Sequence, residues 1–469
     1  MVRRPTSTST FGVSKRENHD STDFYRRFTS PDLSPDAEVA PHRSLDKLIV
    51  GDARRMVEVP DSSVALVVTS PPYFAGKEYE QALGQGGVPA TYLEYLDLLR
   101  SVFRQCAQKL EPGGRIAVNV ANLGRRPYRS LSADVIGILQ DDLRLLLRGE
   151  IIWVKQRGSS GSCAWGSFQR PGNPVLRDLT ERVIVASKGR FDRAISAKDR
   201  ARRQLPSEAS MTRDDFMENT LDLWEIPAES ATRVGHPAPF PVELPSRLIQ
   251  LYTYRSDLVL DPFAGSGTTA VAAVRTGRHY VGYDLDESYI KLAEARVDQE
   301  RERLALAAKS AGATVSLPAV PQPHGLGEDV QVRALREGQA AKEVARALLG
   351  TAGFADIRDD QRQPGGLLVS YTARDSRGRL WLFDVAGGFT THRGGLRRAD
   401  VLWRALGKAA VLREVGSSPL VLLTADAPER GPSAGTLKQV VGANKPIYDV
   451  IDLVRSDALA RLRALCSAE

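Results

Sequence analysis

A proline-rich corner follows a short apolar run, and its polar groups suit the binding of a planar amine. Residues 67–73 read VVTSPPY and include Ser70, Pro71, Pro72 and Tyr73. Proline holds φ at about −65° and lacks an N–H group, so the turn is stiff and its carbonyls remain available as acceptors. The Ser70 hydroxyl and the Pro71 carbonyl can accept the two hydrogens of an exocyclic amine, whose nitrogen then attacks a sulfonium methyl group in line. Tyr73 would stack on the planar base that carries this amine.

The same corner has two plainer interpretations. A rigid turn can end a strand without doing chemistry, and a Pro-Pro-Tyr segment can also be a ligand for small recognition domains. The chemical interpretation further requires that a base be flipped out of a duplex, at a cost of a few kcal/mol. The corner by itself leaves all three interpretations open.

A glycine-rich loop forms a second candidate site. Residues 261–269 read DPFAGSGTT between an apolar run and a helical pattern, where an open parallel sheet binds its ligand. Gly265 and Gly267 allow close approach of the backbone, and a helix N-terminus offers N–H groups to an anion. Asp284 lies about 20 residues beyond Gly265, a spacing at which a carboxylate can hold ribose hydroxyls. The loop therefore favours a small anionic ligand that carries an adenosyl group.

Neither of two common phosphate motifs fits this loop. The dinucleotide pattern lacks its third glycine, because Thr268, Thr269 and Ala270 follow Gly267, and the P-loop pattern is absent. The plainer alternative is a glycine turn that only permits close packing of a strand on a helix, with Asp284 at a surface strand end.

Short apolar runs alternate with helical patterns around both corners. Strands are predicted at residues 48–50, 64–69, 116–120, 151–154, 183–186, 258–260 and 280–283. Helices are predicted at residues 92–110, 131–147, 242–254, 268–275 and 287–307. This alternation predicts an α/β fold with a mostly parallel sheet between helices.

Together these segments resemble the β group of DNA amino-methyltransferases, in which the catalytic motif precedes the cofactor motif. The resemblance covers about residues 45–305 and includes GDA at 51–53, EIIWVK at 150–155 and HPAPFP at 236–241. It implies an enzyme with a Rossmann-like sheet that binds S-adenosyl-L-methionine. This enzyme would methylate a flipped base in duplex DNA. The resemblance further implies a restriction-modification system, with a cognate restriction endonuclease as a candidate partner.

The resemblance also assigns site residues. Ser70, Pro71, Pro72 and Tyr73 form the catalytic turn. Contacts to the cofactor are expected from Asp52, Phe240, Pro241, Asp261, Phe263, Ala264, Gly265, Ser266, Gly267, Thr268 and Asp284. Asp284 would bind the ribose and Asp52 would lie near the adenine. The alternatives are that Asp52 caps a following helix and that Phe240 is ordinary core.

Ser70 sets the expected target atom. Family members with serine here tend to methylate N4 of cytosine, whereas aspartate tends to mark N6-adenine enzymes. Because a hydroxyl accepts an amine hydrogen about as well as a carboxylate does, N6 of adenine remains the alternative. C5 methylation is disfavoured, since it needs a thiolate and no Pro-Cys turn ends a strand.

The length of 469 residues predicts two or three domains. We expect a flexible arm at 1–43, a methyltransferase domain at 44–308 with a target-recognition insert at about 156–232, a linker at 309–329 and an α/β domain at 330–469. The insert combines aromatic and basic side chains that suit phosphate contacts and base readout: Trp165, Phe168, Arg157, Arg170, Arg177, Lys188, Arg190, Arg193, Lys198, Arg200, Arg202 and Arg203.

The C-terminal unit weakly resembles the restriction-endonuclease-like core, whose active form carries an acid on one strand and an acid-x-Lys pattern on the next. Here Leu367–Val369 holds no acid, and Ala386 follows Asp384 where lysine is expected. A metal-dependent nuclease needs several ligands and a base. We therefore predict a noncatalytic module that contacts DNA, with a fused nuclease as the alternative.

Composition sets weaker limits. A formal net charge of +7 favours a polyanionic partner without identifying it. No apolar run approaches the roughly 20 residues of a membrane helix, and residues 1–43 lack the apolar stretch of an export signal. A cytoplasmic enzyme with no membrane contact is therefore expected. Cys106, Cys163 and Cys466 lack the spacing of a zinc site or of a disulfide framework, so no metal site is predicted.

Overall fold

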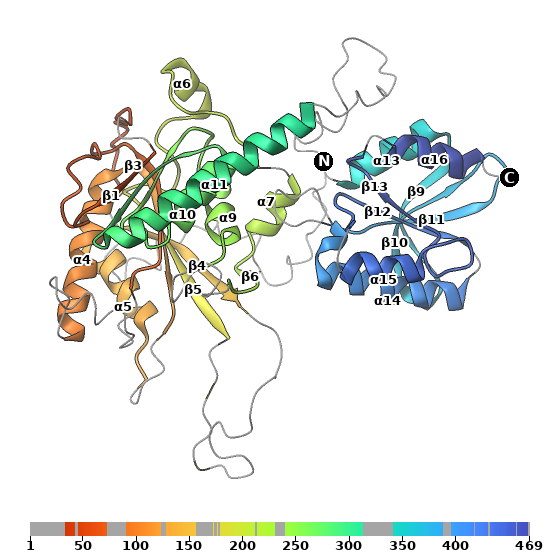
Figure 1. Cartoon of the computed structure of the whole chain (residues 1–469), viewed down its shortest axis with the longest axis horizontal. Coiled ribbons are helices and arrows are strands. Elements are labelled where there is room, and N and C mark those ends of the chain that lie inside the picture. The colour runs from red at the N-terminus through yellow and green to blue at the C-terminus, as the bar shows by residue number, and fades with distance from the viewer. Residues whose placement is uncertain are drawn as a thin grey trace.

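In the computed structural model, the described residues form two β-sheets, one of eight strands and one of five (Figure 1). The structure describes residues 33–42, 46–72, 91–122, 128–155, 172, 176, 179–211, 213–229, 240–312, 341–387, 395–416, 418–429, 432–455 and 457–467. Among these residues no helix is both long and apolar enough to span a bilayer.

The larger sheet has the strand order β1-β8-β7-β2-β3-β5-β4-β6. Neighbouring strands are parallel, except that β5 runs antiparallel to both β3 and β4. This confirms the prediction of a mostly parallel sheet. The strands are β1 (Lys47–Val50), β2 (Val64–Thr69), β3 (Leu110–Val120), β4 (Leu146–Val154), β5 (Thr180–Ser187), β6 (Leu223–Glu225), β7 (Leu258–Asp261) and β8 (His279–Asp284).

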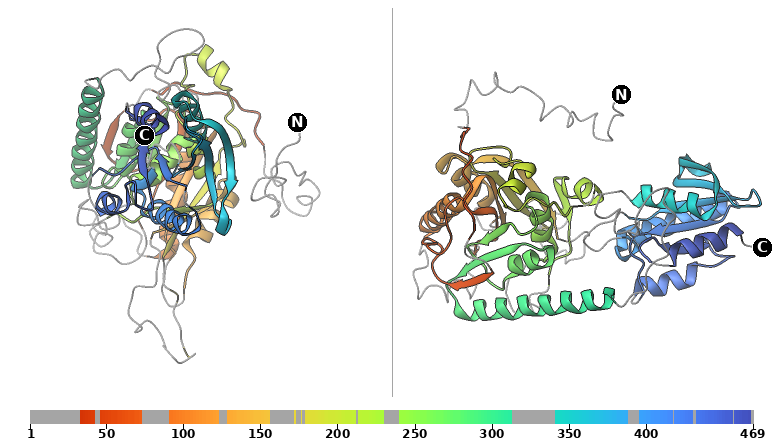
Figure 2. Two further views of the ribbon diagram at one scale, coloured as in Figure 1. Left: turned by 90° about the vertical axis from the view of Figure 1, so that its right-hand side faces the viewer. Right: turned by 90° about the horizontal axis from the view of Figure 1, so that it is seen from above.

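Helices cover both faces of this sheet, which explains why its central strands are apolar throughout. Val67 of β2 packs with α4 (Tyr92–Lys109) and α5 (Leu131–Gly137) on one face. Leu66 and Val68 pack with α9 (Glu243–Tyr252) and α10 (Thr268–Thr276) on the other. A strand buried on both faces reads as a continuous apolar run. The long helix α11 (Glu287–Gly312) lies against α10 and, as Figure 2 shows, extends toward the smaller sheet.

The helix predicted at residues 131–147 is wrong in its last five residues, 143–147. α5 ends at Gly137, a single π-helical turn (η2, Ile138–Asp142) follows, and Arg144 takes a φ of 55°. β4 then begins at Leu146. The apolar residues around the turn suit a helix and a buried strand equally well, so periodicity could not locate the boundary.

The smaller sheet has the order β13-β12-β11-β10-β9, which confirms a second α/β unit. Its strands are β9 (Ala355–Arg362), β10 (Leu368–Arg374), β11 (Leu380–Val385), β12 (Leu420–Thr424) and β13 (Asp449–Asp452). One face packs on α13 (Ala341–Ala352) and α16 (Ala458–Ser467), the other on α14 (Ala399–Val415) and α15 (Pro432–Val440). The sequence did not predict β9, because this edge strand is mostly charged and exposed.

Asp384 of β11 is paired with a lysine from a different element than the nuclease pattern expects. Its Oδ2 lies 2.7 Å from Nζ of Lys408 on α14, and its Oδ1 accepts the backbone N–H of Ser370 at 3.2 Å. Within the described part of the chain, no group of three or more His, Cys, Asp or Glu side chains is arranged to hold a metal. A noncatalytic role for this unit stays a prediction.

The short helix α7 (Arg213–Asn219) contacts both units of the chain. The Asp214 carboxylate accepts the N–H of Ala341 at the start of α13, at 3.0 Å. Glu218 accepts hydrogen bonds from Arg247 of α9 at 3.0 Å and from Arg398, which precedes α14, at 2.6 Å. The smaller unit is thus joined to the larger one through a helix that lies in the predicted insert.

Candidate active site

The proline corner and the glycine loop meet at the carboxyl edge of the larger sheet. Their strands are neighbours, since Val67 of β2 pairs with Leu260 of β7. At the ends of these strands the Thr69 hydroxyl donates to the Asp261 carboxylate at 2.7 Å. Ser70 follows Thr69 directly, so it lies beside the start of the loop. This is the edge at which open α/β sheets bind their ligands.

Asp261 ties three segments together. Besides Thr69, it accepts the Thr269 hydroxyl of α10 at 2.7 Å and the backbone N–H of Phe263 at 3.1 Å. The residue is only 3% exposed, and burial raises the pKa of its carboxyl to about 6 even though these donors act in the opposite direction. Both carboxylate oxygens therefore have protein partners, which makes Asp261 a clamp between the two corners.

The glycine loop packs directly on α11. Gly265 and Gly267 have φ values of 47° and 73°, and Gly267 is the N-cap of α10. A Cβ atom on Gly267 would lie 2.6 Å from the Cβ of Ala293 on α11. Asp284 at the end of β8 accepts the N–H of Gly265 at 2.8 Å, and burial raises the pKa of its carboxyl. The loop is thus shaped by positive φ and by contacts on two sides.

Replacing Gly267 with alanine is expected to lower the free energy of unfolding by roughly 2–3 kcal/mol, because the change adds a backbone strain and a clash with Ala293. Affinity for the loop's ligand should fall with it. Urea unfolding of the variant measures the first effect. Gly407 is the matched control, since a Cβ there meets nothing within 4 Å. Equal stability of the Gly267→Ala and Gly407→Ala proteins would contradict the close packing.

Asp52 lies beside this edge, at the end of β1. The neighbouring Gly51 donates its N–H to the carbonyl of Asp284 at 2.9 Å. The Asp52 carboxylate accepts hydrogen bonds from Nε–H and from the backbone N–H of Arg54. The hydrogen bond from the Arg54 side chain lowers the pKa of Asp52. A turn, not a helix, follows Asp52, so the alternative in which it caps a helix is wrong.

Phe240 and Pro241 precede α9, the helix that leads into β7. Phe240 is partly buried against the core cluster that contains Leu244 and Val259. The described residues therefore give Phe240 a core contact, which agrees with the plainer interpretation of this side chain and leaves a ligand contact as a prediction. Residues 236–239 and Tyr73 lie outside the described residues.

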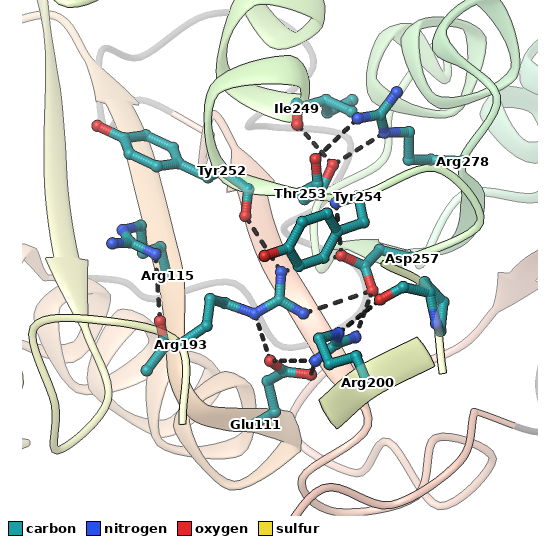
Figure 3. A network of polar contacts seen from close by, with 12 residues as sticks. Glu111, Arg115, Arg193, Arg200, Ile249, Tyr252, Thr253, Tyr254, Asp257 and Arg278 are labelled. Atoms are coloured by element: carbon teal, nitrogen blue, oxygen red, sulfur yellow. Dashed lines mark hydrogen bonds and ion pairs between the residues drawn. The ribbon is translucent and has the colours of Figure 1, made fainter. Parts of the chain in front are cut away.

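Two arginines grouped with the DNA contacts belong instead to a buried ionic network (Figure 3). Arg193 and Arg200 both pair with Glu111 and Asp257, and Arg200 lies 2.8 Å from an Asp257 oxygen. Burial opposes the charge of Arg193, but the two carboxylates raise its pKa overall. Both guanidinium groups also lie over the ring of Tyr254.

This network lies at the amino ends of β3 and β7, opposite the glycine loop. The assignment of Arg193 and Arg200 to DNA contacts is therefore corrected, because charges held in buried pairs are not available to phosphates. Lys188 is likewise bound to the scaffold, since its Nζ donates to the Leu110 carbonyl at 2.6 Å. Arg190, Lys198, Arg202 and Arg203 are described by the structure, and a DNA contact from them stays a prediction. Arg157, Arg170, Arg177, Trp165 and Phe168 lie outside the described residues.

Sequence reasoning overlooked three polar residues of this site. Thr69 and Thr269 lie inside the two motifs, but their position next to Asp261 follows from the pairing of β2 with β7, which the sequence does not give. Arg296 of α11 lies in neither motif. Its Nη1 donates to the Ser266 carbonyl at 2.5 Å, and it lies 2.8 Å from the Ser266 hydroxyl.

The edge suits an adenosyl amino acid. Backbone turns with positive φ and a helix N-terminus favour a carboxylate. The carboxylates of Asp284 and Asp52 lie at the ends of neighbouring strands. They can accept hydrogen bonds from the hydroxyl groups of a ligand and attract its positive charge. The residues at the edge therefore fit S-adenosylmethionine by their chemistry.

Comparison with known proteins identifies the larger unit. Residues 64–295 match the DNA methylase model of N6 and N4 methyltransferases. The protein TTHA0409 of Thermus thermophilus, described as a DNA modification methylase and solved with S-adenosyl-L-methionine, is 32% identical over 54% of this chain and 94% of its own, with a TM-score of 0.42. The chain belongs to the N6/N4 DNA methylase family.

Curated relatives match about the same share of this DNA methylase. The Type II methyltransferase M.MjaI of Methanocaldococcus jannaschii is 27% identical over 55% of this chain and 93% of its own length. M.BglI of Bacillus subtilis is 29% identical over 53% of this chain and 84% of its own. The chain is therefore an S-adenosylmethionine-dependent DNA methyltransferase, with the motif order of the β group. The family match ends before the smaller sheet begins.

Proposed function

We propose that this methyltransferase transfers a methyl group to N4 of cytosine in duplex DNA. The observation that carries the proposal is the hydrogen bond between Thr69 and Asp261, because it holds Ser70 next to the cofactor loop. Serine at this position favours N4 of cytosine, and N6 of adenine is the alternative.

Ser70 and Pro71 act on the amine of the base. The Ser70 hydroxyl and the Pro71 carbonyl accept its two hydrogens, which directs the nitrogen lone pair away from the turn. The two prolines keep the turn from adjusting, so the acceptors are positioned before the base arrives. Pro71 is buried and Ser70 and Pro72 are half-buried, which limits competition from water. Tyr73 stacks on the flipped base and offsets part of the unstacking energy.

The cofactor, when bound, supplies the electrophilic methyl group on its sulfonium. Residues 263–268 and the N-terminus of α10 would hold its carboxylate end, and Asp284 would bind the ribose. Asp52 would lie near the adenine, and Phe240 and Pro241 would line the same side. Asp261 holds the loop in place through its contacts with Thr69 and Thr269.

We further propose that the enzyme is site-specific and belongs to a restriction-modification system. The relatives M.MjaI and M.BglI are Type II methyltransferases, which supports this role. A cognate restriction endonuclease is the corresponding partner. The C-terminal unit is proposed to be a noncatalytic DNA contact, since Lys408 neutralises its buried Asp384.

The deciding experiment incubates the protein with methyl-labelled S-adenosylmethionine and unmethylated duplex DNA of varied sequence, followed by digestion to nucleosides and chromatography. Label in N4-methyldeoxycytidine is expected. Label in N6-methyldeoxyadenosine would mean that the target is adenine and not cytosine. RNA and a protein extract, offered in parallel, serve as competing substrates. Label in either of these but not in DNA would refute the proposal.

A further inference from the structure

Arg296 of α11 contacts the cofactor loop on both sides of Gly267, at Ser266 and at Thr268. Its Nη1 lies 2.5 Å from the Ser266 carbonyl oxygen, 2.8 Å from the Ser266 hydroxyl and 3.2 Å from the Thr268 hydroxyl. One guanidinium nitrogen thus bridges both flanks of Gly267. Ala293, one helical turn earlier on the same face of α11, is the residue against which Gly267 packs.

The contact fixes one peptide unit of the loop. The carbonyl of Ser266 is held by Arg296, and the N–H of the same peptide, on Gly267, donates to the Ala264 carbonyl at 2.8 Å. With both ends bonded, the peptide cannot rotate, so the N-cap geometry of α10 is set. The guanidinium charge also offsets the negative end of that carbonyl dipole, which would otherwise repel an approaching carboxylate.

We propose that Arg296 is a positioning residue for the carboxylate of S-adenosylmethionine. It acts through the loop at Ser266–Thr268 and touches neither the methyl group nor the base. The inference rests on the proposed use of this loop to bind the cofactor. It predicts that Arg296 matters for ligands that carry the carboxylate and matters little for ligands that lack it.

The test compares S-adenosylmethionine with decarboxylated S-adenosylmethionine, which keeps the sulfonium, the ammonium and the adenosine. Displacement of labelled S-adenosylmethionine gives both dissociation constants. In Arg296→Gln, affinity for S-adenosylmethionine should fall roughly tenfold while affinity for the decarboxylated ligand changes by less than about twofold. KM for the cofactor should rise and kcat at saturation should stay near wild type. Arg296→Lys, which retains the charge, should restore part of the affinity for S-adenosylmethionine and leave that for the decarboxylated ligand unchanged.

Arg303→Gln is the matched control, since Arg303 lies on the same helix and pairs only with Glu300 among the contacts described for it. It should leave both dissociation constants unchanged. An equal loss of affinity for both ligands in Arg296→Gln would overturn the inference and indicate a general loss of loop structure. Failure of the wild-type protein to bind S-adenosylmethionine would instead refute the proposed cofactor loop itself.

Discussion

Replacing Ser70 with alanine is expected to slow methyl transfer by roughly 100-fold while changing the affinity for S-adenosylmethionine by less than about twofold. The hydroxyl is proposed to accept an amine hydrogen as charge develops on the nitrogen. Removing one such acceptor costs about 2–3 kcal/mol of transition-state stabilisation. Single-turnover transfer of label to duplex DNA measures the chemical step, and cofactor binding is measured separately.

Ser63 offers the matched control for this change. It lies just before the same strand, at the opposite edge of the sheet, and its buried hydroxyl donates to the Pro60 carbonyl at 2.7 Å. Ser63→Ala should lower stability by about 1 kcal/mol without slowing methyl transfer. If Ser70→Ala turned over as fast as Ser63→Ala, the amine would have to be bound by other groups.

Replacing Asp261 with asparagine is expected to reduce methyl transfer by roughly 10- to 100-fold, even though the protein should be no less stable near neutral pH. An amide offers one acceptor oxygen where the carboxylate offers two, so one of the two threonine hydroxyls must accept from the amide N–H instead of donating, which changes the geometry of the contact. A shift of the proline corner relative to the loop by even a fraction of an ångström weakens the alignment of the reacting atoms. Stability and activity should therefore separate in this variant.

The pH dependence of stability tests the same clamp. Burial raises the pKa of Asp261 from 3.8 to about 6, so the folded state binds this proton more tightly than the unfolded chain does. The resulting stabilisation is fully present below about pH 4 and is lost as the pH rises through about 6, a change of roughly 3 kcal/mol. An asparagine side chain cannot titrate, so Asp261→Asn should gain stability relative to the wild type over this range.

Urea unfolding of both proteins at several pH values measures this difference directly, because the other titrating groups are shared. A difference that does not change between about pH 4 and pH 7 would mean that the carboxyl of Asp261 titrates normally and is not buried as described. Loss of activity without any pH-dependent difference would point to a direct contact with the cofactor instead of a clamp.

The sequence alone predicted the methyltransferase family and most strands of the larger sheet. Short-range patterns carry this information, because a stiff proline corner, a glycine loop with an adjacent helix N-terminus and runs of apolar residues depend on neighbours within a few positions. The same local rules were wrong for residues 143–147, where an apolar stretch suits a helix and a buried strand equally.

Only the tertiary structure decided which distant residues share the edge of the sheet. It placed Thr69 and Thr269 on one carboxylate, and it brought Arg296 of α11 against Ser266. It also separated the basic residues of the insert, since Arg193 and Arg200 are neutralised in a buried network. No spacing along the chain encodes these contacts, because they depend on strand order and on which face of a helix packs inward, and both are set by the folding of the whole domain.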